Sequence, residues 1–232
     1  MKQFYSLSQN PGTTGEGYYR LFFAEKKLPY SYQALKCDDL ITDVLRMKEI
    51  GASGFSVSMP YKTSVIALLD EEDHLVTEFK TCNTVVIQDG RLKGYNTDYQ
   101  GMMFALSTMP RDGMVSILGD GSMGTMFKEV LGDRANVFSR RLGNWEKRHD
   151  ITGTVINCTS FGTTTFDSPF EVLPQVTTVI DLGIRANDLK IQSEGRGIKY
   201  ITGRDFYRHQ FMKQFEIYTG VPLCIEEIEK YD

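Results

Sequence analysis

The sequence has few of the residues that build metal sites and disulfide frameworks. Its 232 residues include four cysteines, three histidines and one tryptophan. The cysteines lie far apart and form no C-x-x-C pair, which is typical of reduced thiols in a cytoplasmic protein. The histidines lack the spacing of metal ligands, so we expect no metal site.

Long runs of apolar or of basic residues are also missing. No apolar run approaches the ~18–20 residues of a membrane span, and the N-terminus lacks the apolar core of a signal peptide. The net charge is −4 without a long basic run, which argues against a nucleic-acid partner. The length and the 41% hydrophobic content fit one large or two small globular domains. We therefore expect a cytoplasmic protein without membrane or nucleic-acid partners.

Strand-like and helix-like segments alternate over the first half, which indicates an α/β layer structure. Asp89-Gly90 joins two apolar runs and is a strong hairpin signal. Between the first strand and the first helix lies a Gly-, Thr- and Asn-rich loop at 8–17, which either only turns the chain or presents hydroxyls to a ligand. The predicted strands are 3–7, 31–36, 54–57, 84–88 and 91–95, and the predicted helices 18–25, 39–50 and 60–70.

Lys62 occupies an electrostatically unfavourable position. The strand at 54–57 is followed by Pro60, which is well suited to the first position of a helix. Lys62 then falls in the first helical turn, at the positive end of the helix dipole, where acidic side chains are favoured. It is either a solvated surface lysine or, where partly desolvated, a group suited to proton transfer. Asp98, taken alone, reads as the N-cap of a following helix.

The second half restarts with a strand at 114–118 and a glycine-rich turn. The run Gly119-Asp120-Gly121-Ser122-Met123-Gly124 has the spacing G-x-G-x-x-G and opens a helix at 123–131. This arrangement lets the backbone approach a pyrophosphate at the helix N-terminus. The next strand, 135–138, ends in Ser139-Arg140-Arg141, where an NAD-preferring site would carry Asp or Glu. Serine and two arginines favour a 2′-phosphate, hence NADP.

The remaining segments complete an α/β pattern. Buried parallel strands are predicted at 154–160 and 178–182, with a further strand at 199–202. Helices are predicted at 204–218 and 224–231, a stub of helix within 142–150, and loops at 185–197.

Several motifs, in the same order and at matching intervals, resemble those of the shikimate dehydrogenase family. Gly54-Phe55-Ser56-Val57-Ser58-Met59-Pro60-Tyr61-Lys62 resembles the family's G-x-N-V-T-x-P-x-K segment. Cys82-Asn83-Thr84-Val85 resembles its A-V-N-T strand, and Gly94-Tyr95-Asn96-Thr97-Asp98 matches G-x-N-T-D. Ile156-Asn157-Cys158-Thr159 is similar to its I-N-A-T strand. Near the end, Gly203, Gln210, Phe215 and Tyr218-Thr219-Gly220 fall at the family's spacing.

The resemblance implies roles for individual residues. Lys62 and Asp98 would be the acid–base pair, with Asp98 orienting the lysine. Asn83 and Gln210 would bind substrate hydroxyls, and Ser58 would replace a substrate-binding threonine. The residues implied to hold NADP are Gly119, Gly121, Ser122, Met123, Gly124, Ser139, Arg140, Thr159 and Gly203.

The resemblance also implies an architecture and an activity. We expect two α/β lobes with a cleft between them: a substrate-binding and catalytic domain at 1–103 and a compact Rossmann-like NADP domain at 104–203. Helices at 204–232 would pack back on the first domain. The implied activity is reversible hydride transfer between NADP and a ring ketone or alcohol of shikimate, quinate or a related cyclic hydroxy acid, as in aromatic amino-acid biosynthesis by the chorismate pathway. The protein would be a monomer or homodimer.

Three departures from the family pattern leave a second interpretation open. The family's N-terminal S-x-S-P-x-x-H-N, whose serines hold the substrate carboxylate, is replaced by Gly12-Thr13-Thr14-Gly15. The hydroxyls of Thr13 and Thr14 could take over that contact. Asp120 places an anion close to the expected pyrophosphate, and the nucleotide half is short. Asp120 and the short nucleotide half favour the alternative of a nucleotide- or ligand-sensing protein on the same fold with weak or no turnover, whereas Lys62, Asn83, Asp98 and Gln210 favour an enzyme. A related folate-type dehydrogenase on the same two-domain plan is disfavoured by the G-x-N-T-D match.

Overall fold

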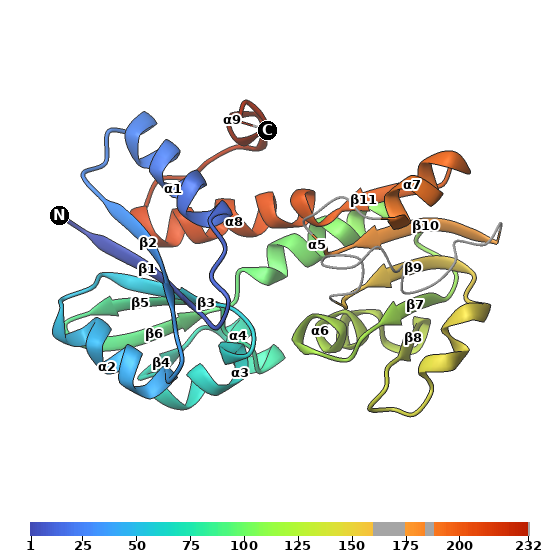
Figure 1. Cartoon of the computed structure of the whole chain (residues 1–232), viewed down its shortest axis with the longest axis horizontal. Helices are drawn as coiled ribbons and strands as arrows, with labels where there is room; N and C mark the ends of the chain where they lie inside the picture. Colours follow the sequence, from blue (N-terminus) through green and yellow to red (C-terminus); the bar gives the residue numbers. More distant parts are fainter. Residues whose placement is uncertain (160–174, 184–187, 232) are drawn as a thin grey trace. The chain divides into compact units, whose positions relative to one another are not determined.

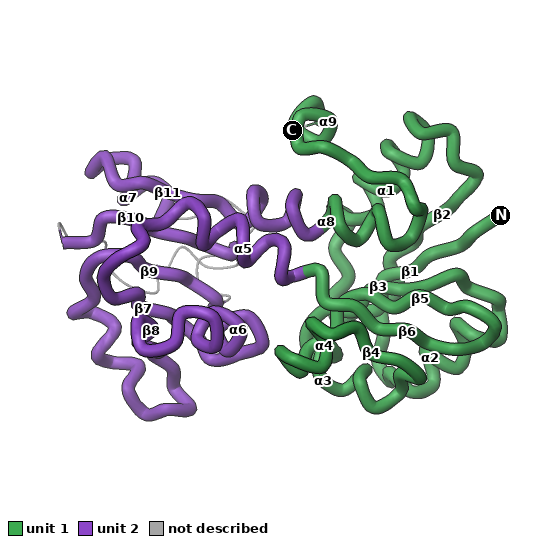
Figure 2. The backbone as a smooth tube through the Cα atoms, turned by 180° about the vertical axis from the view of Figure 1, so that it is seen from behind, with its two compact units in different colours: residues 1–97, 211–232 green, residues 98–210 purple. Residues whose placement is uncertain are grey.

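The computed structural model describes residues 1–159, 175–183 and 188–231 (Figure 1). The chain forms two compact units, Met1–Thr97 with Phe211–Asp232, and Asp98–Gln210 (Figure 2). Each unit contains its own β-sheet. None of the helices in the described ranges is both long enough and apolar enough to cross a membrane.

The first unit is built on a mixed six-stranded sheet with the order β2-β1-β3-β5-β6-β4. The pairs β1–β2, β1–β3 and β4–β6 are parallel, whereas β3–β5 and β5–β6 are antiparallel. Asp89 and Gly90 join β5 to β6 with positive φ angles of 52° and 74°, which confirms the predicted hairpin. The strands are β1 (Gln3–Ser8), β2 (Ser31–Lys36), β3 (Gly54–Val57), β4 (Glu71–Glu72), β5 (Thr84–Gln88) and β6 (Arg91–Tyr95).

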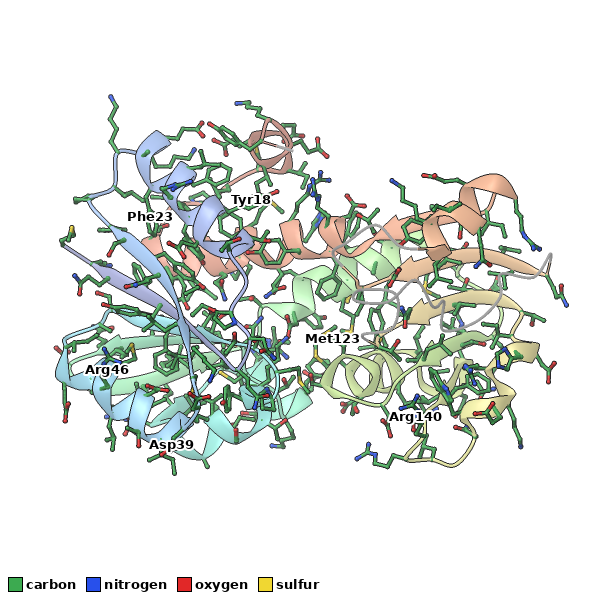
Figure 3. The ribbon with its side chains drawn as sticks, viewed as in Figure 1. Tyr18, Phe23, Asp39, Arg46, Met123 and Arg140 are labelled. Atoms are coloured by element: carbon green, nitrogen blue, oxygen red, sulfur yellow. The ribbon has the colours of Figure 1, made fainter. Side chains whose placement is uncertain are left out.

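Helices cover both faces of this sheet. Side chains alternate along β1, so Leu7 and Phe4 point to opposite faces. Leu7 belongs to a hydrophobic core with Val44 and Phe55. The elements that cover this core are α2 (Leu40–Glu49), α3 (Tyr61–Ser64), η1 (Val65–Leu68) and α4 (His74–Phe79). Phe4 stacks on Tyr218 at 4.5 Å, within an aromatic layer supplied by α1 (Thr14–Glu25) and α8 (Gly203–Thr219). Figure 3 shows Tyr18 and Phe23 on α1, and the short α9 (Ile225–Glu229) follows α8.

Over its described residues, the second unit is built on a five-stranded sheet with the order β11-β10-β9-β7-β8, in which every pairing is parallel. Its central strands are apolar because both faces are covered, as is usual for parallel sheets. This Rossmann-like sheet confirms the predicted α/β class. The strands are β7 (Val115–Leu118), β8 (Ala135–Phe138), β9 (Gly153–Asn157), β10 (Val176–Asp181) and β11 (Lys199–Thr202).

The helical elements of this unit pack closely on its sheet and on one another. A Cβ on Gly101 of α5 would lie 2.7 Å from the carbonyl oxygen of Phe206, so only glycine allows α5 and α8 to approach this closely. Leu118, Val155 and Leu189 share one core cluster. The elements are α5 (Asp98–Thr108), α6 (Ser122–Leu131), η2 (Gly132–Arg134), η3 (Trp145–Asp150) and α7 (Asp188–Gly195).

Three local predictions were wrong. Helix α1 begins at Thr14, not at 18, and so includes the last four residues of the predicted loop. Part of the loop predicted at 185–197 is helix α7, which the fully buried side chain of Leu189 anchors to the core; 185–187 lie outside the described residues. The helix predicted at 60–70 is a four-residue α-helix after Pro60, continued by a 3₁₀ turn to Leu68.

Candidate functional site

The glycine turn of the second unit has the geometry that its spacing predicts. Gly119 ends β7 with φ +95°, which favours glycine, and a Cβ on Gly124 would lie 2.0 Å from the carbonyl oxygen of Gly119. Gly124 therefore lets α6 start directly against the turn. A Cβ on Gly121 would meet nothing within 4 Å. The absent side chain of Gly121 leaves backbone open at the N-terminus of α6, as close approach of a pyrophosphate requires.

A pocket of about 310 Å³ lies in the second unit where parallel strands β7, β8 and β9 end. In open parallel sheets, ligands bind outside these carboxyl ends. Figure 3 shows Arg140 on the segment that follows β8 and Met123 on α6. The lining residues are Gly119, Asp120, Ser139, Arg140, Arg141, Trp145 and Thr159.

An ion pair crosses one side of this pocket. Arg141 Nε donates to Asp120 Oδ2 at 2.6 Å, and Arg141 Nη2 donates to the backbone oxygen of Asp120 at 3.2 Å. Burial favours protonation of Asp120, but the hydrogen bonds from Arg141 and Ser139 outweigh it, so the pKa of Asp120 is lowered. The carboxylate is therefore charged and compensated at neutral pH.

The segment after β8 is held in shape by one amide side chain. Asn144 Oδ1 accepts from the backbone of Ser139 at 2.9 Å, and Asn144 Nδ2 donates to the backbone oxygen of Val137 at 2.8 Å. The hydroxyl of Ser139 accepts from the backbone of Leu142 at 3.1 Å. Arg140 and Arg141 thus belong to a turn that these hydrogen bonds hold in shape.

The end of β9 carries a buried polar group that positions Thr159. Asn157 Oδ1 accepts from the hydroxyl of Thr159 at 2.6 Å and from its backbone nitrogen at 3.1 Å. Asn157 Nδ2 donates to Asp181 Oδ1 at 2.9 Å, and the hydroxyl of Tyr200 donates to Asp181 Oδ2 at 2.8 Å. Asn157 and Asp181 are fully buried, so this hydrogen-bond network holds the lining residue Thr159 in a defined position.

Gly203 lies at the start of α8 and does not line this pocket, and neither do the predicted cofactor residues Gly121, Ser122, Met123 and Gly124 at the start of α6. A Cβ on Gly203 would lie 2.4 Å from the backbone oxygen of Leu182 and 2.6 Å from that of Gly183. The absence of a side chain therefore permits the close approach of α8 to the chain after β10.

In the first unit, three of the predicted residues meet where β1 and β3 end. Ser58 is exposed just beyond β3, and its backbone nitrogen donates to the backbone oxygen of Leu7 at 3.3 Å. Asn83 stands next to it, since its backbone oxygen accepts from Val57 at 2.9 Å. Lys62 is half-buried on α3, and its backbone oxygen accepts from Cys82 at 2.8 Å. Ser58 and Lys62 are close in the sequence, and the pairing of β3 with β5 brings the more distant Asn83 next to them.

The side chain of Asn83 is part of a buried hydrogen-bond chain. Its Oδ1 accepts from the hydroxyl of Thr84 at 2.8 Å and from the backbone of Thr97 at 3.0 Å. Gln214 Nε2 of α8 donates to the hydroxyl of Thr84 at 2.7 Å, and the hydroxyl of Tyr19 on α1 donates to Gln214 Oε1 at 3.0 Å. These contacts tie α1, β5 and α8 to the residue that precedes Asp98.

The other predicted residues have different settings. Thr13 and Thr14 are exposed at the start of α1, and the hydroxyl of Thr13 does not cap the helix. Asp98 is the first residue of α5 and only 1% exposed, so its carboxylate is buried. Gln210 is half-buried on α8, at the end of the second unit.

The prediction of site residues omitted three that line the pocket. Asp120 and Arg141 were visible in the sequence as charges beside the glycine turn and after β8, but their pairing depends on β7 and β8 lying side by side. Trp145 gave no signal beyond being the single tryptophan.

Comparisons with known proteins relate this chain to shikimate dehydrogenases. A family model described as the shikimate dehydrogenase substrate binding domain matches residues 16–85. The shikimate dehydrogenase (NADP(+)) of Thermococcus kodakarensis is 30% identical over 199 residues, which cover 75% of this chain and 73% of the relative. That of Thermoplasma acidophilum is 26% identical over 230 residues, covering 89% of this chain and 86% of the relative.

Solved structures show the same fold. Shikimate dehydrogenase 1 from Peptoclostridium difficile superposes with a TM-score of 0.86 at 21% identity, covering 99% of this chain and 96% of that one. The Thermus thermophilus enzyme in complex with NADP(H) and shikimate has a TM-score of 0.82 at 22% identity, covering 99% and 98%.

A unit on a mixed sheet, joined to a unit on a parallel Rossmann-like sheet with a glycine turn, defines a class of two-unit α/β proteins with a dinucleotide-binding fold. Within that class, the sequence relationship is specific. The chain belongs to the shikimate dehydrogenase family.

Proposed function

We propose that this protein is an NADP-dependent oxidoreductase that interconverts a ring ketone and alcohol of shikimate or a related polyhydroxy cyclohexane carboxylate, such as quinate. The observation that carries the proposal is the pocket at the ends of β7 and β8, where Ser139, Arg140 and Arg141 occupy the place of the acidic residue of an NAD site. The relatives named as NADP(+) enzymes support the same cofactor.

The described residues fit this cofactor. The open backbone at Gly121 suits a pyrophosphate, and guanidinium groups suit a 2′-phosphate because they donate in a planar fork. In this proposal Ser122, Met123, Thr159 and Gly203 complete the binding surface with Gly119 and Gly124. Bound NADPH would supply the hydride in the reducing direction.

The protein's own part in the reaction is to bind the substrate and move a proton. We assign Ser58, Asn83 and Gln210 to substrate hydroxyls, and the exposed hydroxyls of Thr13 and Thr14 to the carboxylate. Lys62 Nζ would donate a proton to the ring carbonyl oxygen as the ketone is reduced, and would accept it from the hydroxyl in the reverse direction. Its positive charge would also stabilise negative charge developing on that oxygen.

Asp98 would orient Lys62 in this scheme, from the buried N-terminus of α5. The domain assignment that goes with the proposal is a substrate-binding and catalytic domain at 1–103, an NADP domain at 104–203 and returning helices at 204–232. Turnover would require both domains.

A substrate screen with purified protein tests the proposal. NADPH binding is measured by its fluorescence, and turnover by loss of NADPH absorbance with 3-dehydroshikimate, or by its gain with NADP and shikimate or quinate. Oxidation of NADPH by a cyclic keto acid supports the proposed activity. Saturable NADPH binding without turnover across the panel would instead support the sensing alternative. Failure to bind any dinucleotide contradicts both the proposed activity and a nucleotide-sensing role.

A further inference from the structure

The pocket of the second unit contains a carboxylate where an anionic ligand is expected. Asp120 lies between two glycines of the turn, and its side chain is 23% exposed. A 2′-phosphate carries roughly −1.5 to −2 charges at neutral pH and would be repelled by an uncompensated carboxylate. A free 2′-hydroxyl at the same place would meet no such repulsion, because a carboxylate accepts from hydroxyls.

Arg141 changes this balance. Its guanidinium bonds both the carboxylate and the backbone oxygen of Asp120, so one cation reaches from the end of β8 to the glycine turn. The hydroxyl of Ser139 also helps to lower the pKa of Asp120. Among the described residues that line the pocket, three are charged, two cations and one anion, and together they carry a net charge of +1. Without Arg141 the net charge would be zero, and the carboxylate would be open to a ligand hydroxyl.

We propose that the Asp120–Arg141 pair determines cofactor selectivity: Arg141 neutralises the glycine-turn carboxylate so that a 2′-phosphate is accepted, and Asp120 positions the Arg141 guanidinium at the pocket. The inference rests on the proposed NADP function and names a second, chain-specific determinant beside Arg140. Arg141 acts here mainly by compensating Asp120, so the effects of changing the two residues are strongly non-additive.

The test measures binding of two small probes by isothermal titration calorimetry. Adenosine 2′,5′-bisphosphate carries the 2′-phosphate and adenosine 5′-monophosphate does not. The proteins are wild type, Arg141→Ala, Asp120→Asn and the double variant. Arg111→Ala is the matched control, because Arg111 is an exposed arginine of the same unit outside the pocket. Arg141 is 75% exposed, so its removal should leave the fold intact, as a matching circular dichroism melt would verify.

We expect Arg141→Ala to lower the affinity for the bisphosphate by about 10- to 100-fold, the usual effect of losing an interaction with a charged group. The monophosphate, which carries only the 5′-phosphate, should be weakened much less. Asp120→Asn alone should change bisphosphate affinity less than Arg141→Ala does. The double variant should regain most of the affinity that Arg141→Ala loses, because the exposed carboxylate is gone.

Two results would overturn the inference while leaving the proposed function intact. One is equal weakening of both probes by Arg141→Ala. The other is a double variant as weak as Arg141→Ala, which would mean that Arg141 contacts the phosphate without reference to Asp120. A wild-type protein that binds the bisphosphate no better than the monophosphate would instead contradict the proposed NADP function, and this inference with it.

Discussion

Gly121 and Gly124 separate the binding role of the glycine turn from its folding role. A Cβ on Gly124 would lie 2.0 Å from the carbonyl oxygen of Gly119 and 2.9 Å from its carbonyl carbon, and both are backbone atoms. A Cβ on Gly121 would meet nothing within 4 Å, and its φ of −70° and ψ of −173° suit any residue. Alanine at the two positions should therefore perturb two different properties.

Gly124→Ala is expected to destabilise the fold. Overpacking typically costs ~1–3 kcal/mol, and a side chain can often relieve it by moving. Here the obstructing atoms belong to the backbone of Gly119, whose φ of +95° already limits its alternatives. We therefore expect a loss of about 3 kcal/mol or more, which lowers Tm by roughly 6–12 °C in a chain of this size.

Gly121→Ala is expected to leave stability nearly unchanged. Restricting the unfolded chain favours alanine by ~0.4–1 kcal/mol, but alanine is a poorer N-cap than glycine, which offsets this gain. The new methyl group would stand where a pyrophosphate approaches the backbone. We expect NADPH affinity to fall by about tenfold or more, equivalent to one charge-assisted hydrogen bond.

The assay is thermal unfolding by circular dichroism together with NADPH titration by fluorescence. Gly17→Ala is the matched control, since Gly17 lies in α1 of the other unit with open space around its Cβ position. It should raise stability slightly and leave NADPH binding unchanged. Wild-type NADPH affinity in Gly121→Ala would refute the proposed pyrophosphate position, and an unchanged Tm in Gly124→Ala would refute the steric reasoning.

Three further predictions concern chemistry, cofactor choice and pH. Lys62→Ala should lower kcat by about 10²–10⁴ without changing the NADPH Kd, and wild-type turnover would contradict the proton-transfer role. Arg140→Ala should lower the affinity for NADPH about tenfold or more with little effect on the affinity for NADH. The control Arg111→Ala should change neither affinity. An equal loss of affinity for both cofactors in Arg140→Ala would exclude a 2′-phosphate contact. The hydrogen bond from Lys26 lowers the pKa of Glu227 to about 2, so this pair should stabilise the fold above the unfolded-state value of about 4.3 and lose its effect as pH falls towards 2. Glu227→Gln should thus lower Tm by at most about 4 °C at pH 7, because a partly exposed ion pair contributes ~0.2–1 kcal/mol. The difference in Tm from wild type should disappear near pH 2. A difference that persists at pH 2 would contradict the assignment of the lowered pKa to this pair.

Elements with strong local signals were predicted well from the sequence. The hairpin at Asp89-Gly90 and the strand–turn–helix around Gly119 are dictated by turn chemistry and periodicity, and both were confirmed. Helix α7 was missed because only Leu189 and Ser193 of its polar segment are fully buried, which is too little for an apolar periodicity. The early start of α1 was missed because Gly15 and Gly17 read as loop residues, although the aromatic layer that follows them holds the helix in place.

Charged groups at the site show a second limit of sequence reasoning. From the sequence, Asp120 appears to oppose an anionic cofactor, and this anion was one reason to consider a sensing protein. In the structure the same carboxylate is bound by Arg141, 21 residues further along the chain. Their pairing requires β7 and β8 to be adjacent, parallel and in register, and neither residue carries a local signal of its partner. An isolated charge in a sequence therefore says little about a site until the strand order is known, and once it is known Asp120 no longer argues against NADP.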